Sequence, residues 1–332
     1  MKYSVGIGLT NDCNLNCGHC YRDKNQISNI TLEQIKILCE TLPIKAIGLG
    51  TGENILNPEF YKILDFLSTQ KINLSIASNG LTLTSIPEKY LKLFHDVEVS
   101  IDFPTKKGQD DFRGNGNWNL VHKAIDRCKN KKIMLSILTT MMSINYEKMD
   151  QMIDLARSHD VNLRVCVYQS VNSNKYHLRY GEFWEGFRLL LGASKLLSCS
   201  EPVVRAILRL GDVYSPCGYK SIRINPRGQI IPCVYWNICE ESHQIPLIKD
   251  LTTLKEKVFD TYQFDIARQI PSVAADCPCQ GGCASRRIIK GDLNSHDEYC
   301  PWCRGDQIDL EWQAGPSINL VRINNNCTTI VR

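Results

Sequence analysis

The stretch NDCNLNCGHCY, residues 11–21, places three cysteines within eight positions, directly after the first apolar run of the chain. Disulfides are rare in a reducing compartment, so clustered cysteines there indicate metal or redox chemistry. Three thiolates spaced C-x3-C-x2-C in one loop can bind three irons of a [4Fe-4S] cluster and leave the fourth iron without a protein ligand. A substrate or cosubstrate binds at such an open position, so Cys13, Cys17 and Cys20 predict a catalytic cluster.

Two other interpretations of this stretch compete with the cluster. A structural zinc site takes four ligands, and His19 is the only local candidate for the fourth. Because His19 lies between two of the cysteines, simultaneous ligation would be cramped. The second interpretation is that the three cysteines are simply buried in the core and bind no metal. The spacing favours the iron–sulfur cluster over both.

The composition is that of an ordinary globular protein. The 332 residues are 43% hydrophobic and 22% charged, and 16 of them are cysteines, far more than packing requires. The chain does not open with a charged run followed by an apolar segment, and no apolar run reaches the roughly 20 residues of a membrane span. The net charge of +4 is spread without a Lys/Arg block. We therefore expect a soluble, cytoplasmic protein with no membrane and no nucleic-acid partner.

The first 200 or so residues repeat one kind of unit. Short apolar, β-branched runs alternate with amphipathic helical stretches, which predicts six βα units around a parallel sheet. The expected strands are 5–9, 46–50, 74–77, 97–101, 133–139 and 163–168, and the expected helices lie near 31–42, 58–69, 88–94, 117–129, 145–158 and 182–196. Thr31 and Gln34 form a capping-box pattern at the start of the first helix. In such sheets the chemistry gathers at the loops that leave the carboxyl ends of the strands.

Three cysteines with this spacing, in a loop after the first strand, resemble the hallmark of the radical S-adenosylmethionine (radical SAM) enzymes. The resemblance covers essentially the whole chain and implies a partial (β/α)6 TIM-like barrel. It implies that the open iron binds the amino and carboxylate groups of S-adenosylmethionine. It also implies reductive cleavage to methionine and a 5′-deoxyadenosyl radical, which abstracts a substrate hydrogen. An external electron donor of the flavodoxin or ferredoxin type is expected.

Other residues at the carboxyl ends of the expected strands resemble the cosubstrate-binding motifs of that family. Residues 51–54, TGEN, resemble its Gly-Gly-Glu-Pro segment, with Thr51 in place of the first glycine. The resemblance implies that Gly52 allows close backbone approach and that Glu53 accepts from the methionine ammonium. It places His19 or Tyr21 near adenine. The full set of implied cosubstrate-binding residues is Thr51, Gly52, Glu53, Ser78, Asn79, Ser100, Asp102, Arg113, Tyr168 and Gln169.

Beyond about residue 205 the cysteine density rises and the βα alternation stops. We therefore expect a radical SAM barrel over 1–208 and a small cysteine-rich domain over 209–332. Its C-x10-G-x4-C element resembles the SPASM extension, which holds one or two auxiliary [4Fe-4S] clusters. By this resemblance the ligands are Cys217, Cys233, Cys239 and Cys283 in one cluster and Cys277, Cys279, Cys300 and Cys303 in the other. A one-cluster version, or zinc in one site, stays open.

Three further cysteines have a second interpretation. Cys166 lies in an expected strand whose alternate residues enter the barrel, and Cys199 lies in the expected crossover between the domains. Either is a candidate hydrogen donor to a substrate radical, as is Cys239 if it is not a cluster ligand. Simple packing is the alternative for Cys166 and Cys199.

The resemblance favours a ribosomally synthesised precursor peptide as the substrate. Epimerisation, cross-linking and backbone excision all stay open, because they share the first hydrogen abstraction. The cysteine loop is too close to the start for an N-terminal leader-recognition domain, so a separate recognition protein is expected. A radical SAM dehydrogenase or epimerase of a sugar or aminoglycoside is the alternative. A non-catalytic Fe–S electron-transfer or sensor protein is the alternative of another class. Such a protein would have no use for the polar residues at the carboxyl ends of the strands.

Overall fold

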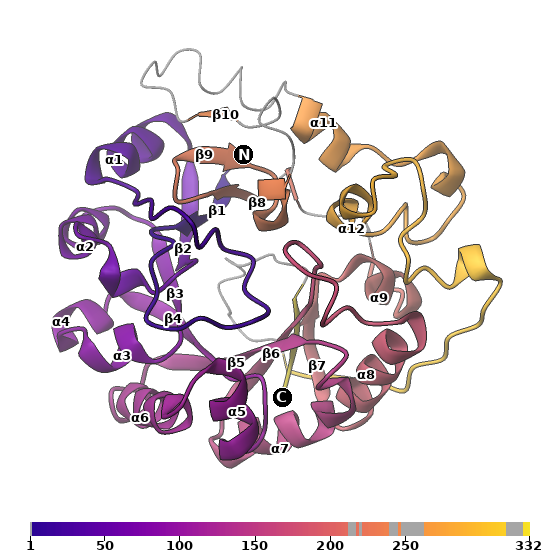
Figure 1. Cartoon of the computed structure of the whole chain (residues 1–332), viewed down its shortest axis with the longest axis horizontal. Coiled ribbons are helices and arrows are strands. Elements are labelled where there is room, and N and C mark those ends of the chain that lie inside the picture. The colour runs from indigo at the N-terminus through magenta and orange to yellow at the C-terminus, as the bar shows by residue number, and fades with distance from the viewer. Residues whose placement is uncertain (1, 212–216, 219–220, 239–244, 247–261, 317–327) are drawn as a thin grey trace.

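The computed structural model of the chain describes residues 2–211, 217–218, 221–238, 245–246, 262–316 and 328–332 (Figure 1). Cys239 lies outside the described residues, so both roles expected for it stay predictions. Within these ranges, no helix has the length and apolar character that crossing a membrane requires.

Six parallel strands form the centre of the fold and pair in chain order. They are β1 (Tyr3–Gly8), β2 (Ile44–Gly50), β3 (Asn73–Ser78), β4 (Phe94–Ser100), β5 (Met134–Met141) and β6 (Asn162–Val167). The helices that follow these strands lie on the outer side of the curved sheet (Figure 1). The partial (β/α)6 barrel expected from the alternation of strands and helices is confirmed.

Helix α1 (Leu32–Thr41) shows how the sequence specifies these elements. The Thr31 hydroxyl accepts from the Gln34 backbone while the Gln34 side chain accepts from the Thr31 backbone, so the expected capping box is confirmed. Ile35 and Leu38 are buried against the sheet. The other barrel helices are α2 (Phe60–Ser68), α3 (Leu81–Ser85), α4 (Glu88–Leu91), α5 (Lys106–Arg113), α6 (Asn117–Asn130), α7 (Met149–Ser158) and α8 (Tyr180–Gly192).

Three elements differ from the expectation. Helix α4 begins the helix expected at 88–94, and the short helix α3, which ends before Pro87, was not expected. Helix α5 was not expected. The last predicted helix ends at Gly192, and strand β7 (Lys195–Cys199) follows it. Cys199 therefore lies in a strand of the sheet, and its expected place in a crossover is corrected.

The second half of the chain also contributes to the sheet. Strand β8 (Ser221–Ile224) pairs in parallel with β1, and β9 (Gln229–Ile231) and β10 (Ile245–Pro246) continue from it. At the other side, β12 (Thr329–Val331) inserts between β6 and β7, and β11 (Gln313–Ala314) pairs with β7. The sheet is thus continuous across residue 208. The division into 1–208 and 209–332 stays a prediction.

The cysteine-rich part lies beside this sheet. It contains α11 (Tyr262–Arg268) and α12 (Ala284–Ile289), and the short helix α9 (Pro202–Ile207) precedes it in the chain (Figure 1). Arg286 of α12 is buried and forms ion pairs with Glu201 and Asp297. These pairs tie α12 to the end of the barrel.

Candidate active site at the carboxyl ends of the strands

A cavity of about 200 Å³ opens at the carboxyl ends of the barrel strands. All three cysteines of the loop after β1 line it. Cys17 is buried, and Cys13 and Cys20 are partly exposed. The spacing therefore does what the sequence predicts, since it brings three thiols to one cavity.

Glycines of two neighbouring strands make room for this cavity. Gly6 and Gly8 of β1 pair in register with Gly48 and Gly50 of β2, and all four line the cavity. A Cβ atom on Gly6 would overlap the Arg223 guanidinium. The sequence analysis missed this wall, although the alternation VGIG and IGLG was visible in the two strands.

Polar contacts hold the cysteine loop in place. The Leu15 backbone N–H and the Asn79 side-chain amide each lie 3.5 Å from Cys13 Sγ, as donors to sulfur. Asn79 also donates to Asn14 Oδ1 at 2.8 Å. Burial raises the pKa of Cys13 and Cys17 above the ordinary thiol value. Metal binding at these thiols would therefore release protons.

Glu53 lies behind the cavity wall and forms hydrogen bonds to the loops that follow β1 and β3. Its fully buried carboxylate accepts from the Ser78 hydroxyl at 2.6 Å and from the backbone N–H groups of Asn79 and Thr82 at 2.8 and 2.7 Å. Its own N–H donates to the Asp12 carbonyl at 2.8 Å. Glu53 is not among the residues that line the cavity. The carboxylate expected to accept from the cosubstrate ammonium thus caps the start of α3.

Asp102 has a similar supporting position. Its carboxylate is buried, accepts from Arg113 Nε at 2.7 Å and lies 3.8 Å from His19 Nε2. Burial alone would raise the pKa of Asp102, but Arg113 and His19 outweigh it and hold the pKa below its ordinary value. Arg113 lines the cavity and Asp102 does not. Asp102 therefore positions Arg113.

His19 presents a neutral aromatic ring to the cavity. Burial lowers the pKa of His19 to about 4, even though Asp102 acts in the opposite direction. The ring stacks on Phe112 with centroids 5.0 Å apart, and Nδ1 is buried without a hydrogen-bond partner in the described part of the chain. Tyr21 also lines the cavity, and its hydroxyl lies 2.8 Å from Thr51 Oγ1.

The structure brings most of the expected cosubstrate-binding residues to this one cavity. Those that line it are Thr51, Gly52, Ser78, Asn79, Ser100, Arg113, Tyr168 and Gln169. Gly52 has a positive φ of 66°, and a Cβ atom there would overlap the backbone oxygens of Thr10 and Asp12. Their roles toward a cosubstrate stay predictions.

The two described hydrogen-donor candidates differ in their access. Cys166 of β6 lines the cavity and is 7% exposed. Cys199 of β7 is not among the lining residues, and its sulfur lies 3.3 Å from Thr329 Oγ1. Burial raises the pKa of each thiol to about 12, so both stay protonated near neutral pH.

Charged residues around the cavity were missed by the sequence analysis. Glu98 of β4 and Arg223 of β8 line it, and both are almost fully buried. Arg164 of β6 forms hydrogen-bonded ion pairs with Glu98 and Asp96, each at 2.6 Å. The signal in the sequence was weak, because a charged residue in an expected strand is assigned to the solvent face unless the register is known.

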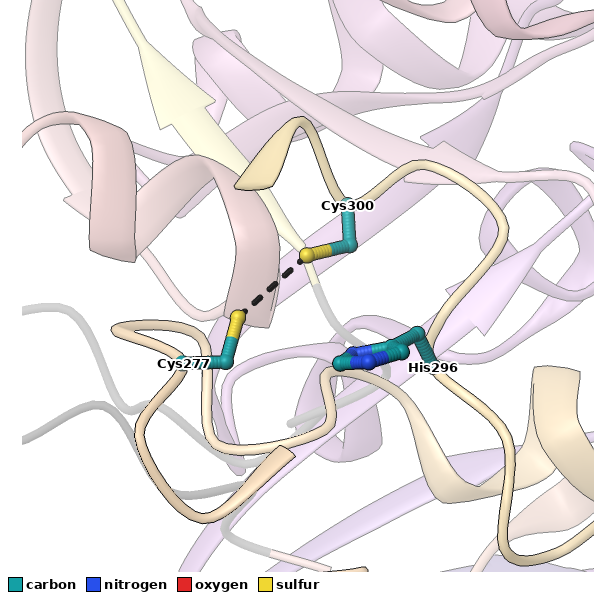
Figure 2. Close-up of side chains that lie close together, drawn as sticks. All are labelled: Cys277, His296 and Cys300. Carbon is teal, nitrogen blue, oxygen red and sulfur yellow. Dashed lines mark hydrogen bonds between the residues drawn. The ribbon is translucent and has the colours of Figure 1, made fainter. Parts of the chain in front are cut away.

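The later cysteines fall into two groups. In the first, the thiols of Cys217 and Cys233 are hydrogen-bonded, with Cys283 close enough to raise the pKa of Cys233 further. In the second, the sulfurs of Cys277, Cys279 and Cys300 lie 3.2 to 3.4 Å from one another. Figure 2 shows Cys277 and Cys300 with His296 beside them. Cys303 is exposed, and its sulfur donates to the Cys300 carbonyl at 3.1 Å.

Residues 7–157 match the family model described as the radical SAM superfamily. Together with the cysteine loop, the barrel and the cavity, this match identifies a radical SAM domain over residues 7–157. The cysteine groups behind the barrel are consistent with an auxiliary-cluster domain of the SPASM type.

Two curated relatives and one solved structure define the similarity further. The mycofactocin maturase MftC of Mycolicibacterium smegmatis is 25% identical over 169 residues, which are 47% of this chain and 42% of MftC. The subtilosin biosynthesis protein AlbA of Bacillus subtilis is 23% identical over 344 residues, with 93% of this chain and 73% of AlbA covered. The match thus spans less than half of MftC.

The structure of anSMEcpe with bound AdoMet and the Kp18Cys peptide superposes with a TM-score of 0.70 at 18% identity. The superposition covers 90% of this chain and 94% of anSMEcpe. At this identity the likeness establishes the fold, which extends over both the barrel and the cysteine-rich part.

Proposed function

We propose that this protein is a radical SAM enzyme that abstracts a hydrogen atom from a ribosomally synthesised peptide. One observation carries the proposal: three thiols of a single loop line the same cavity as eight expected cosubstrate-binding residues. A non-catalytic iron–sulfur protein would have no use for that second set.

The residues present fit a cluster with one open iron. Cys13, Cys17 and Cys20 supply three thiolates, and the Asn79 and Leu15 donors to Cys13 match the sulfur hydrogen bonds that tune such clusters. When bound, the cluster and S-adenosylmethionine supply the radical chemistry. An external electron donor of the flavodoxin or ferredoxin type belongs to this proposal.

The chain itself would bind and orient the cosubstrate. Arg113, held by Asp102, offers a fixed cation for a carboxylate. The glycine wall and Gly52 allow backbone groups to approach closely. Burial lowers the pKa of His19 to about 4 even with Asp102 nearby, so its ring is neutral near pH 7 and is suited to stacking on an adenine.

Cys166 is the better placed of the two described hydrogen-donor candidates. It stands on the cavity wall, and its raised pKa keeps the S–H bond intact near neutral pH. Cys199 has its thiol against Thr329 and is better explained as a packing residue. Epimerisation, which needs a hydrogen atom returned to the substrate, is therefore the outcome that this chain's own residues favour among the three.

The relatives support a peptide substrate. MftC is named a maturase, AlbA a bacteriocin biosynthesis protein, and anSMEcpe was solved with a peptide. We extend this chemistry to the present chain and include a separate leader-recognition protein in the proposal. Oxidation or epimerisation of a sugar or aminoglycoside is the competing function.

The test is to incubate the reconstituted enzyme with S-adenosylmethionine, a reductant and the peptide encoded by a short reading frame beside its gene, in D2O. We expect 5′-deoxyadenosine and a peptide one mass unit heavier, because the substrate radical takes a deuterium atom from the solvent-exchanged Cys166 thiol. The added reductant and a solvent deuteron then return the Cys166 thiyl radical to the thiol. The Cys166→Ala variant should still form 5′-deoxyadenosine but leave the peptide without deuterium. An unchanged peptide beside a processed aminoglycoside would overturn the peptide assignment.

A further inference from the structure

A compact group of metal-ligating side chains lies outside the catalytic cavity. The sulfurs of Cys277, Cys279 and Cys300 are 3.2, 3.3 and 3.4 Å apart in their three pairings. One ring nitrogen of His296 lies within 4.8 Å of both the Cys277 and the Cys300 sulfur. Figure 2 shows the imidazole beside the two thiols, on the loop that leads to Cys300.

The histidine has an unused ligand atom. Nδ1 of His296 is buried and has no hydrogen-bond partner among the residues that the structure describes. Leaving a buried polar nitrogen unpaired is unfavourable. A metal ion held jointly with the neighbouring thiols would remove that cost.

The spacing fits one metal ion better than a cubane. Ligand atoms on a tetrahedral zinc ion lie about 3.5–3.8 Å apart, because Zn–S bonds measure about 2.3 Å and Zn–N bonds about 2.0 Å. In a [4Fe-4S] cluster each thiolate binds a different iron, so the sulfurs lie further apart. The three sulfurs, 3.2 to 3.4 Å apart, would need to separate by only a few tenths of an ångström to bind one zinc ion.

The loop that carries His296 and Cys300 is fixed by its neighbour Asp297. The buried Asp297 carboxylate accepts from the Cys283 N–H at 2.6 Å and pairs with Arg286. The Asp297 backbone carbonyl accepts from the Cys300 N–H at 3.0 Å. A Cβ atom on Gly282 would overlap Asp297, so the chain approaches closely there. Asp297 therefore holds the loop that carries His296 and Cys300 in place without metal.

The remaining thiol of this region is less well placed. Cys303 is exposed, and its sulfur donates to a backbone carbonyl. Its thiol neighbours that of Cys300 but is not one of the three sulfurs that lie within 3.4 Å of one another.

We propose that Cys277, Cys279, Cys300 and His296 form a mononuclear Cys3His zinc site, with Cys303 outside the ligand set. Four protein ligands close the coordination sphere, which is the mark of a structural rather than a catalytic zinc site. Its mechanical role follows from Tyr299, which stacks on Phe183 with centroids 4.0 Å apart and donates to the Leu178 carbonyl at 3.0 Å. The ion would clamp the cysteine-rich part onto the barrel near α8.

This assignment departs from a second auxiliary [4Fe-4S] cluster on Cys277, Cys279, Cys300 and Cys303. It leaves the group of Cys217, Cys233 and Cys283 for an auxiliary iron–sulfur cluster. The full chain should then carry about eight irons, from two clusters of four, and one zinc.

The test is to express the full chain in medium that contains both iron and zinc, purify it anaerobically and measure its metal content. No S-adenosylmethionine is added. We expect one zinc per chain, and His296→Ala should lose most of it while the iron content stays unchanged. Cys303→Ala, the matched control, should keep its zinc. His296→Cys, which offers four thiolates, should also keep zinc and guards against a mere folding defect in His296→Ala.

Three results would overturn the proposal. They are a chain without zinc, zinc that survives in His296→Ala, and a loss of about four irons in Cys303→Ala, which would indicate a cubane on the thiols. Because none of these measurements depends on turnover, failure of the zinc site and failure of the proposed function are distinguishable.

Discussion

At the scale of single residues, Gly52 shows how backbone geometry makes the cysteine loop. Its positive φ of 66° disfavours side chains, and a Cβ atom would also overlap the carbonyl oxygens of Thr10 and Asp12. Both residues lie within the three positions before Cys13. The glycine therefore sets how closely the loop after β2 approaches the cysteine loop.

We expect Gly52→Ala to reduce cluster assembly, since the clash displaces the loop that carries Cys13. Gly116→Ala is the control, because Gly116 also has a positive φ, 83°, but open space around a Cβ atom. Both variants should lose about 1–2 kcal/mol of stability from the left-handed backbone. Only Gly52→Ala should also lose iron after reconstitution. Equal iron in the two variants would refute the steric account.

Cys166 provides a second prediction at this scale. Burial raises its pKa to about 12, against about 8.5 for a free thiol, so at pH 8 its thiolate fraction is about a thousandfold lower. Iodoacetamide at pH 8 should therefore leave Cys166 unmodified in the folded chain and modify it in urea. Peptide mass spectrometry reads out both states. Comparable alkylation in both would show that Cys166 is not the protected S–H that the proposal needs.

Sequence reasoning predicts these residues unevenly. The positions of Cys13, Cys17 and Cys20 on one cavity follow from spacing alone. The supporting roles of Glu53 and Asp102 do not, because whether a carboxylate faces the cavity or the loop behind it depends on which donors surround it. Those donors come from α3 and β5, elements distant in the chain.

At the scale of elements, a buried ion-pair network joins β4 to β6 inside the barrel. Arg164 contacts Asp96 and Glu98, and all three side chains are at most 1% exposed. Burial raises the pKa of Asp96 to about 6 despite the neighbouring guanidinium. The network is therefore sensitive to loss of its cation.

We expect Arg164→Met to lower the free energy of unfolding by about 3–5 kcal/mol, because it removes the guanidinium that pairs with two buried carboxylates. Lys107→Met is the control, since it removes an exposed pair with Asp111 and should cost less than about 1 kcal/mol. Urea denaturation of the two variants measures both values. A cost for Arg164→Met no larger than that of the control would contradict the buried network.

Most barrel elements could be predicted from local pattern, and the exceptions share one cause. Strands β1 to β6 have apolar runs that identify them without knowledge of their partners. Strands β7, β8 and β12 are short, and they become strands through pairing with β1, β6 and each other. Pairing between segments so distant in sequence leaves no local periodicity to detect.

At the scale of the whole molecule, the barrel sheet and the cysteine-rich part form one continuous architecture. The cavity takes its wall from β1 to β6 and part of its rim from Arg223, Tyr235 and Thr328, which lie beyond residue 208. Residues of both halves therefore line the same cavity. The cysteine density rises near residue 205, but strands from both sides of that position belong to the same sheet.

The central claim is that the cysteine loop and its cavity generate a radical from S-adenosylmethionine. The most direct measurement is 5′-deoxyadenosine formation by the anaerobically reconstituted and reduced protein, with the Cys13→Ala variant in parallel. We predict 5′-deoxyadenosine and methionine in equal amounts from the parent chain and none from the variant. A parent chain with a fully assembled, reducible cluster that forms no 5′-deoxyadenosine would contradict the account.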